Sequence, residues 1–166
     1  RNVINNLVAM GAGVRAVGTA GTGVAGRMIV EKLEGLGLST DCIISEKDRP
    51  TTRKTRVIAS NQQVLRIDKE IKKNINDESL ARLIGLVKTR LSDIDLIILS
   101  DYDKGLITRE LVKEVVSLAG RHSITILADP KSLDFTKYKD VHVLTPNKKE
   151  ASLAANMDIK TDEDIH

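Results

Sequence analysis

The chain has 166 residues, of which 41% are hydrophobic and 30% are charged, which is the composition of an ordinary globular domain with enough residues to bury a core. Aromatic residues make up only 2% of the chain, which argues against a single-stranded nucleic-acid binder that stacks bases on aromatic rings. The 26 basic and 23 acidic residues leave a net charge of +3, which gives no general argument for binding to DNA.

The first third of the chain predicts helices that alternate with short strands. We expect a helix over residues 3–10, a strand within residues 14–20, a second helix over residues 24–36 and a short strand over residues 41–45. The chain begins with Arg1, in a segment that already has the pattern of a helix. We therefore expect it to be a piece of a longer protein.

Residues 51–58 and 62–68 are β-branched, alternating and strongly polar, and they predict a hairpin that turns near Ser60. We expect two polar faces, which suit a flap outside the core better than a central strand. Alternation places Lys54 and Arg56 on the same side of the hairpin. A phosphate-bearing substrate would favour such a basic surface, but an edge hairpin kept soluble by Lys and Arg explains it equally well.

The remainder of the chain alternates apolar strands with amphipathic helices. Helices are expected over residues 80–91 and 107–118, the second with Thr108 as its cap, and a third begins at residue 148. Strands are expected over residues 95–99, 124–129 and 141–146. This alternation is typical of an α/β protein with a mostly parallel sheet, and we expect a single domain over residues 1–166.

Polar residues follow each of these three strands. They occupy residues 100–104, 129–131 and 145–147, and Glu150 follows one helical turn later. Ligands of open α/β sheets gather beyond the carboxyl ends of the strands, so we expect these residues to form a site at one edge of the sheet. The alternative is that they are only solvated polar residues.

The stretch from Gly21 to Gly26 matches the G-x-G-x-x-G pattern of dinucleotide-binding folds, and Glu46 ends the next strand about 20 residues further on, where such a fold places its ribose-binding acid. These residues support an alternative function as an NAD-binding, Rossmann-type oxidoreductase domain. The polar hairpin after Glu46 interrupts the βαβ pattern. We therefore favour a tight turn between a strand and a helix.

Cysteine and histidine predict neither a metal site nor a nucleophilic site. The single cysteine, Cys42, excludes a disulfide framework and supplies too few ligands for a cysteine zinc site. His122, His142 and His166 are too widely spaced to resemble metal ligands. No apolar stretch is long enough to span a bilayer. We expect a cytoplasmic protein with neither a membrane nor a nucleic acid as partner.

Four stretches of the chain, in this order, resemble one known family: TTRKTRVIASNQQVLRID, LSDYDKGLIT, DPKSLDFTKY and VLTPNKKE. They are similar to the heptose 7-phosphate kinases of the ribokinase (PfkB) sugar-kinase family, which form the kinase half of bifunctional ADP-heptose synthesis proteins. The Asn147-x-x-Glu150 motif is shared broadly among ribokinase-like kinases. The basic hairpin and the Ser-Asp-Tyr-x-Lys-Gly stretch are specific to the heptose-phosphate branch.

The resemblance implies a three-layer, ribokinase-like α/β core with a small β lid that contains residues 51–68. It implies transfer of the ATP γ-phosphoryl group to the anomeric hydroxyl of D-glycero-β-D-manno-heptose 7-phosphate, for ADP-heptose and lipopolysaccharide synthesis. By analogy, Glu150 would hold Mg²⁺ through water. The residues that organise ATP and Mg²⁺ would be Asn147, Lys148, Lys149 and Glu150. The residues that bind the sugar phosphate would be Asn2, Lys54, Arg56, Gln63, Arg66, Asp101, Lys104, Gly105, Asp129 and Lys131.

The catalytic aspartate of the family lies in a G-A-G-D motif that these residues lack, since Gly11-Ala12-Gly13 is followed by Val14. We therefore expect a partial kinase domain, truncated at both ends, with no kinase activity as a separate chain. We also expect a homodimer through the lid, because lid hairpins in this fold often pair between subunits. A further alternative is a non-catalytic, kinase-like interaction domain.

Overall fold

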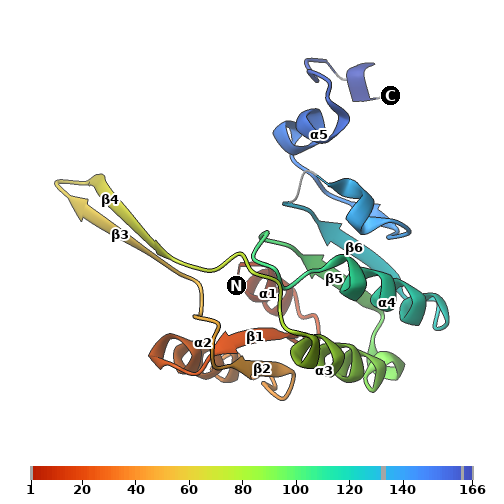
Figure 1. The fold of residues 1–166 in the computed structure, drawn as a ribbon, viewed down its shortest axis with the longest axis horizontal. Coiled ribbons are helices and arrows are strands. Elements are labelled where there is room, and N and C mark those ends of the chain that lie inside the picture. Colours follow the sequence, from red (N-terminus) through yellow and green to blue (C-terminus); the bar gives the residue numbers. More distant parts are fainter. Residues whose placement is uncertain (1, 132–133, 162, 166) are drawn as a thin grey trace. The chain divides into compact units, whose positions relative to one another are not determined.

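The computed structural model describes residues 2–131, 134–161 and 163–165 (Figure 1). The chain divides into two compact units, residues 1–72 and residues 73–166. Each unit has helices and a parallel strand pairing of its own. The expectation that both units belong to one domain stays a prediction.

The first unit combines helices α1 (Asn2–Ala9) and α2 (Val24–Glu34) with a parallel pair of strands. Strand β1 (Gly18–Gly21) pairs with β2 (Ile43–Glu46), and α2 connects the two strands. Gly11 has φ +83°, a left-handed conformation that suits glycine and follows the end of α1. The apolar side chains buried in this unit are Ala16, Ala20, Leu33, Cys42 and Ile44.

Both the first strand and the second helix are shorter than predicted. The pairing of β1 with β2 begins only at Gly18, so the expected strand over residues 14–20 lacks its first part. Helix α2 has Gly35 as its C-cap and so ends before residue 36. Of its expected apolar face, Leu33 is buried, whereas Ile29 is 38% exposed.

The glycines of the G-x-G-x-x-G stretch allow a close approach between β1, α2 and the segment that follows β2. A Cβ atom on Gly26 would collide with the carbonyl oxygen of Gly21, and a Cβ atom on Gly21 would lie 2.5 Å from the carbonyl oxygen of Arg49. The backbone N–H of Gly21 donates to Thr51 Oγ1 at 2.9 Å. The structure thus confirms the tight turn between a strand and a helix.

The hairpin consists of antiparallel strands β3 (Arg53–Ala59) and β4 (Gln62–Lys69). Its turn lies at Ser60 and Asn61, as predicted, with φ values of +48° and +62°. Two successive positive φ values match a type I′ turn, whose twist fits the flanking strands. All residues of both strands are exposed.

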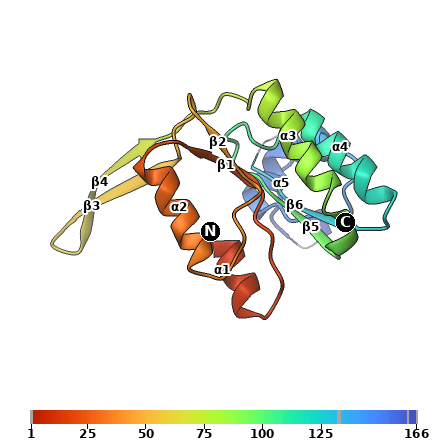
Figure 2. The same cartoon turned by 90° about the horizontal axis from the view of Figure 1, so that it is seen from below.

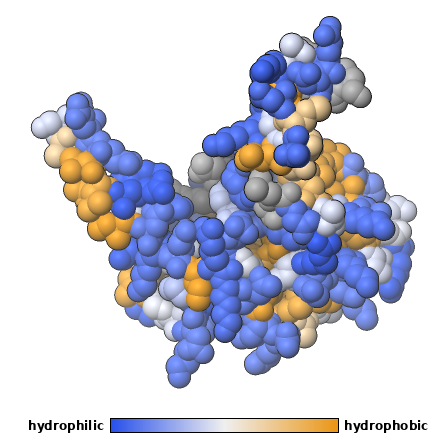
Figure 3. All heavy atoms as spheres, turned by 45° about the horizontal axis from the view of Figure 1, so that its top comes forward, coloured by the Kyte–Doolittle hydropathy of each residue, from blue (hydrophilic) through white to orange (hydrophobic). Residues whose placement is uncertain are grey.

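The prediction that both faces of the hairpin are polar was wrong. Val57 lies opposite Leu65 and Thr55 lies opposite Ile67, so one face carries apolar side chains, whereas Arg56 opposite Arg66 belongs to the other face. Val57, Leu65 and Ile67 are 44%, 53% and 53% exposed. Figure 3 shows apolar side chains gathered along the hairpin. Each strand read separately looks polar, and only their pairing joins the apolar residues of the two strands into one surface.

The second unit contains a parallel sheet in the order β5–β6–β7. Its strands are β5 (Leu96–Ser100), β6 (Thr125–Asp129) and β7 (Val143–Leu144), which lie within one or two residues of the predicted segments. Ile126 and Ala128 of the central strand are fully buried. These two residues alternate along β6, so one face of the central strand forms the core of this sheet, whereas Leu127 on the other face is half-buried.

The helices of this unit are α3 (Asp77–Lys88), α4 (Arg109–Gly120) and α5 (Lys148–Ala155), with short 3₁₀ turns η1 (Leu91–Asp93), η2 (Phe135–Tyr138) and η3 (Glu163–Ile165). Helices α3 and α4 lie side by side (Figure 2). As predicted, Thr108 caps α4, because its Oγ1 accepts from the backbone N–H of Leu111 at 3.1 Å. The apolar side chains buried in this unit include Leu83, Leu99, Leu111, Val112, Val115, Leu118 and Tyr138.

Within the part of the chain that the structure describes, no helix is both long enough and apolar enough to cross a membrane.

We expect Gly26→Ala to lower the free energy of unfolding by about 3 kcal/mol, because the new methyl group would be forced against the backbone of Gly21. Gly85→Ala is the matched control. Gly85 lies inside α3 with no atom within 4 Å of its Cβ position, so this change should raise the free energy of unfolding by about 0.5–1 kcal/mol. Urea unfolding followed by circular dichroism measures both. A Gly26→Ala protein as stable as the wild type would contradict the close packing.

Candidate functional site

The structure brings the polar ends of β5, β6 and β7 together at one edge of the sheet. Ser100 is in register with Asp129, and the backbone N–H of Asp101 donates to the carbonyl of Asp129 at 3.0 Å. On the other side of β6, the backbone N–H of Thr145 donates to the carbonyl of Ala128 at 3.0 Å. The predicted juxtaposition of the three strand ends is therefore confirmed.

Asp101 is a buried anchor at the end of β5. Its side chain is 2% exposed. Its Oδ1 accepts from the backbone N–H of Asp103 at 2.7 Å, and its Oδ2 accepts from the Lys137 ammonium and from the Tyr138 hydroxyl. Lys137 also donates to the carbonyl of Ile107 at 3.1 Å. Asp101 therefore joins the β5–α4 loop to η2, and its direct contact with a sugar stays a prediction.

The other end of this loop is fixed at Gly105. Its φ is +77°, and a Cβ atom there would lie 2.7 Å from the backbone nitrogen of Asn74. The backbone N–H of Ile75 donates to the carbonyl of Gly105 at 2.9 Å. The close approach at this glycine is thus to the chain before α3. Between the two fixed ends, Tyr102 is 56% exposed and Lys104 is half-buried.

Lys131 and Glu150 connect the end of β6 to the start of α5. The Lys131 ammonium forms an ion pair with Glu150 Oε1, and Glu150 Oε2 accepts from the backbone N–H of Asn147 at 2.9 Å. In return, Asn147 Oδ1 accepts from the backbone N–H of Glu150 at 3.0 Å, which completes a capping box. The Asn147 and Glu150 side chains therefore both begin helix α5.

The same contacts set the charge state of this pair. The Lys131 ammonium, followed by the backbone N–H of Asn147, holds the pKa of Glu150 below its ordinary value. The Glu150 carboxylate in turn raises the pKa of Lys131. Both groups are therefore charged near neutral pH.

The donor set fits a magnesium ion that retains most of its water. Among residues 2–131, 134–161 and 163–165, no three His, Cys, Asp or Glu side chains come together as a metal cluster. Mg²⁺ bound with a nucleotide commonly uses one or two carboxylates and keeps several waters. Each oxygen of Glu150 accepts one hydrogen bond from the described residues, which leaves each oxygen a second acceptor position.

The other residues expected at the nucleotide or sugar sites have varied surroundings. Lys148 donates to the carbonyl of Lys160 at 3.1 Å, and Lys149 is exposed. Asp129 is half-buried at the end of β6, and Gln63 is exposed near the tip of the hairpin. Asn2 begins α1, but its side chain lies outside the described part of the chain. Their roles in binding stay predictions.

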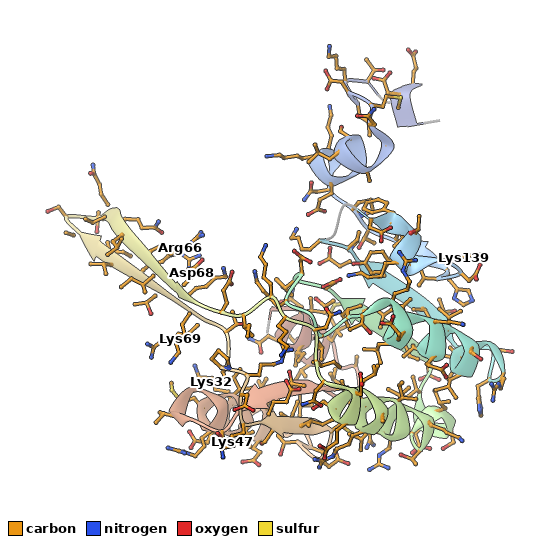
Figure 4. All side chains as sticks on the ribbon, viewed as in Figure 1. Lys32, Lys47, Arg66, Asp68, Lys69 and Lys139 are labelled. Atoms are coloured by element: carbon orange, nitrogen blue, oxygen red, sulfur yellow. The ribbon has the colours of Figure 1, made fainter. Side chains whose placement is uncertain are left out.

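The charged face of the hairpin includes Arg66 and Asp68 of β4 (Figure 4). The Lys54 ammonium lies 3.1 Å from Asp68 Oδ2 and 3.3 Å from Glu70 Oε2, and an Arg66 guanidinium nitrogen lies 3.1 Å from Asp68 Oδ2. The hydrogen bond with Asp68 raises the pKa of Lys54 and lowers that of Asp68. Lys54 is thus already neutralised by two carboxylates.

Arg56 differs from Lys54, because it has no ion pair or side-chain hydrogen bond with any described residue. It lies directly opposite Arg66 in the register of the hairpin. Like charges in this position repel each other, and the ion pair of Arg66 with Asp68 offsets this repulsion only in part, since Arg56 has no such partner among the described residues. Two neighbouring guanidinium groups suit a phosphate, which each can bind through two hydrogen bonds.

Glu46, the acid that the dinucleotide alternative requires, is only 7% exposed and forms an ion pair with Arg49. Its carboxylate therefore serves the packing of this unit. A Cβ atom on Gly26 would also collide with the backbone of Gly21. Both observations indicate that the G-x-G-x-x-G stretch has a structural role. No contact in the described residues supports binding of NAD.

The two partners of Asp101 were not predicted from the sequence. Lys137 and Tyr138 lie 36 and 37 residues further along the chain, and no spacing rule links such distant positions. Nor was a role predicted for Tyr102, although the chain has only two tyrosines and one phenylalanine. The chain is poor in aromatic residues, so the presence of one in a polar loop was the signal that could have identified Tyr102.

Comparison with known proteins gives one consistent result. Residues 1–166 match the model of the pfkB family carbohydrate kinases. The chain is 43% identical over 159 residues to the Bifunctional protein HldE of Desulfatibacillum aliphaticivorans, covering 96% of this chain and 32% of that protein. It is 42% identical over 164 residues to the Bifunctional protein HldE of Wolinella succinogenes, covering 99% of this chain and 35% of that protein. The chain thus spans about a third of the length of these relatives.

Solved structures with the same fold include the tetrameric inhibited form of phosphofructokinase-2 from Escherichia coli. That likeness has a TM-score of 0.72 at 18% identity and covers 99% of this chain and 54% of that chain. The structure of Arabidopsis thaliana ribokinase complexed with ribose and ATP matches with a TM-score of 0.64 at 20% identity, covering 90% of this chain and 48% of that chain. The predicted ribokinase-like α/β fold is confirmed.

We expect the carboxyl group of Glu150 to titrate below 4.5, the value of an unperturbed Glu side chain. Lys131→Met should move the pKa back towards this value, whereas Lys149→Met, which removes an exposed neighbouring charge, should leave it unchanged. Carbon NMR of the Glu150 carboxyl group over a pH series measures each pKa. An unaltered pKa in Lys131→Met would show that the ion pair does not form.

This shift also predicts a pH dependence of stability. Since the folded-state pKa lies below the unfolded one, ionised Glu150 stabilises the fold above about pH 4.5, and this contribution is lost as the pH falls through the lower, folded-state pKa. The difference in stability between wild type and Glu150→Gln should therefore shrink on acidification over this window.

Proposed function

We propose, from the premise that this chain belongs to the pfkB family of carbohydrate kinases, that it forms the sugar side of a kinase acting on D-glycero-β-D-manno-heptose 7-phosphate. ATP would donate its γ-phosphoryl group to the anomeric hydroxyl, giving the 1,7-bisphosphate for ADP-heptose and lipopolysaccharide synthesis. The observation that carries the proposal is the identity of 43% and 42% to proteins named HldE over almost the whole chain. The choice of sugar rests on the resemblance of the hairpin and of Ser-Asp-Tyr-x-Lys-Gly.

The strand ends and the start of α5 supply the groups that such a transfer needs. Phosphoryl transfer depends mainly on positioning and on neutralising the charge of the phosphates. We place the ATP phosphates near Asn147, Lys148 and Lys149, and Mg²⁺ beside Glu150 through water. When bound, Mg²⁺ would offset the negative charge of the phosphates. Lys131 holds Glu150 in place at this position.

The 7-phosphate of the sugar would be bound by the charged face of the hairpin. Arg56 and Arg66 lie opposite each other, and Arg56 makes no ion pair within the described residues. A phosphate between them would relieve their repulsion and accept two hydrogen bonds from each. Lys54 is held by Asp68 and Glu70, so the geometry favours Arg56 over Lys54 for direct contact.

The function is tested with the natural protein at full length. The assay measures the release of ADP when ATP and heptose 7-phosphate are supplied. Arg56→Ala should raise KM for the sugar phosphate about 10- to 100-fold, because a charge-assisted bond is lost, and should leave KM for ATP unchanged. Lys54→Ala should have a smaller effect on KM. Arg53→Ala is the matched control, because Arg53 has the same chemistry on the opposite face of β3.

These outcomes separate the function from the subsite. A wild-type protein that does not phosphorylate the sugar would overturn the proposed function. An active wild type with normal kinetics in Arg56→Ala would overturn only the placement of the 7-phosphate.

We also propose that a second copy of this chain covers the apolar face of the hairpin. Val57, Leu65 and Ile67 form an exposed apolar surface there, and an isolated two-stranded ribbon has no core of its own to bury them. A copy of the same face would bury these side chains and leave the charged face open to the substrate.

Leu65→Lys should therefore convert a homodimer into a monomer, because it would bury an unpaired charge in the interface. Arg56→Gln, on the opposite face of the hairpin, should leave the mass unchanged. Sedimentation equilibrium over a range of protein concentrations measures the mass. A wild type that is monomeric throughout, or a Leu65→Lys protein that remains a dimer, would refute pairing through this face.

A further inference from the structure

Tyr102 is distinguished from the other aromatic residues by its exposure. Tyr138 is 2% exposed and Phe135 is half-buried, whereas Tyr102 is 56% exposed. The described part of the chain contains no other tyrosine or phenylalanine. Core packing therefore does not explain why a large ring occupies this position in a loop of charged residues.

The backbone that carries Tyr102 is nevertheless held firmly. On one side, Asp101 is buried and accepts from Lys137, from Tyr138 and from the backbone N–H of Asp103. The turn that this last bond closes leaves Asp103 with φ +53°. Two residues beyond Asp103, the carbonyl of Gly105 accepts a hydrogen bond from the backbone N–H of Ile75. These bonds thus fix the backbone position from which the Tyr102 side chain projects.

The partners of Asp101 are fixed as well. The Arg109 guanidinium donates to Asp134 Oδ2 at 2.6 Å and to the carbonyl and hydroxyl oxygens of Thr136 at 3.1 and 2.9 Å. These bonds attach η2 to the start of α4, and Lys137 adds its bond to the carbonyl of Ile107. Asp101 therefore meets donors that are already in place. Such support behind a contact residue is what a precise binding site requires.

Tyr102 lies at the same edge of the sheet as Lys131. Glu150 contributes most to the raised pKa of Lys131, and Asp129 and the Tyr102 phenol contribute to it as well, which places the phenol within the electrostatic range of the ammonium. Ligands of parallel sheets bind beyond this edge. Tyr102 and Lys131 each lie two residues beyond Ser100 and Asp129, which are in register at the ends of β5 and β6, so both residues border the edge at which ligands bind.

Resting on the function proposed above, we propose that Tyr102 contacts the sugar and helps to select it, and that Asp101 is a positioning residue that acts through Tyr102. A tyrosine suits this task because its ring offers an apolar surface to the C–H groups of a pyranose, while its hydroxyl bonds a sugar hydroxyl. Few rotatable bonds separate the ring from the fixed backbone, so little conformational entropy is lost on binding.

The test uses the full-length natural protein and steady-state kinetics for each substrate. Tyr102→Ala should raise KM for heptose 7-phosphate about ten-fold, through loss of ring contact and hydroxyl bond, with KM for ATP and the Tm unchanged. Tyr102→Phe, which keeps the ring, should show a smaller rise. His122→Ala, an exposed residue just after α4, is the control and should match the wild type in both KM values.

The positioning role has a separate readout. Tyr138→Phe removes one bond to Asp101 and should raise KM for the sugar but not for ATP, even where it also lowers the Tm. Combined with Tyr102→Ala, it should add little to the rise in KM, because both changes act through the same ring. Equal effects on both substrates, or full additivity, would show a merely structural role for the anchor and overturn this part.

The remaining outcomes decide the contact itself. An active wild type with unchanged sugar KM in Tyr102→Ala overturns the inference and leaves the proposed function standing. A lowered Tm without a change in KM shows that the ring packs against protein, and it overturns the inference too. A wild type inactive on heptose 7-phosphate removes the proposed function and, with it, the inference.

Discussion

The second unit depends on one buried charge, the carboxylate of Asp101. A buried carboxylate must be paired, and removal of one partner from such a pair typically costs about 3–5 kcal/mol. Lys137 and Tyr138 provide the pairing from η2, so the end of β5 and η2 hold each other in place. The loop that bears Tyr102 and the turn η2 are therefore parts of one supported structure.

The hairpin of the first unit has no core of its own, so its side chains are arranged by the pairing of its two strands. Its pairing register sorts the side chains into an apolar face, with Val57 opposite Leu65, and a charged face, with Arg56 opposite Arg66. Each face is unfavourable when left alone, one through exposed apolar area and the other through repulsion of like charges. A substrate phosphate would offset the repulsion on the charged face, and a second subunit would cover the apolar face.

Local signals in the sequence predicted most elements, whereas long-range pairings were missed. The turn at Ser60, the Thr108 cap and the strands at residues 95–99 and 124–129 follow from neighbouring residues, and they were placed within two residues. The anchoring of Asp101 joins residues that are 36 positions apart, so no local pattern records it. The apolar face of the hairpin follows from alternation across the turn, and it was missed because each strand was considered by itself. Strand β1 came out shorter than predicted because its pairing with β2, not its composition, sets its start.

The capping box at α5 has a consequence for how such sequences evolve. Asn147 and Glu150 are the two specified residues of the N-x-x-E motif. The side chain of each accepts a hydrogen bond from the backbone N–H of the other, which stabilises the start of the helix. Selection for folding alone would preserve both residues in a descendant that has lost its catalytic activity. Retention of N-x-x-E in a divergent relative is therefore evidence of an intact helix start, and a pseudoenzyme would be recognised at other positions.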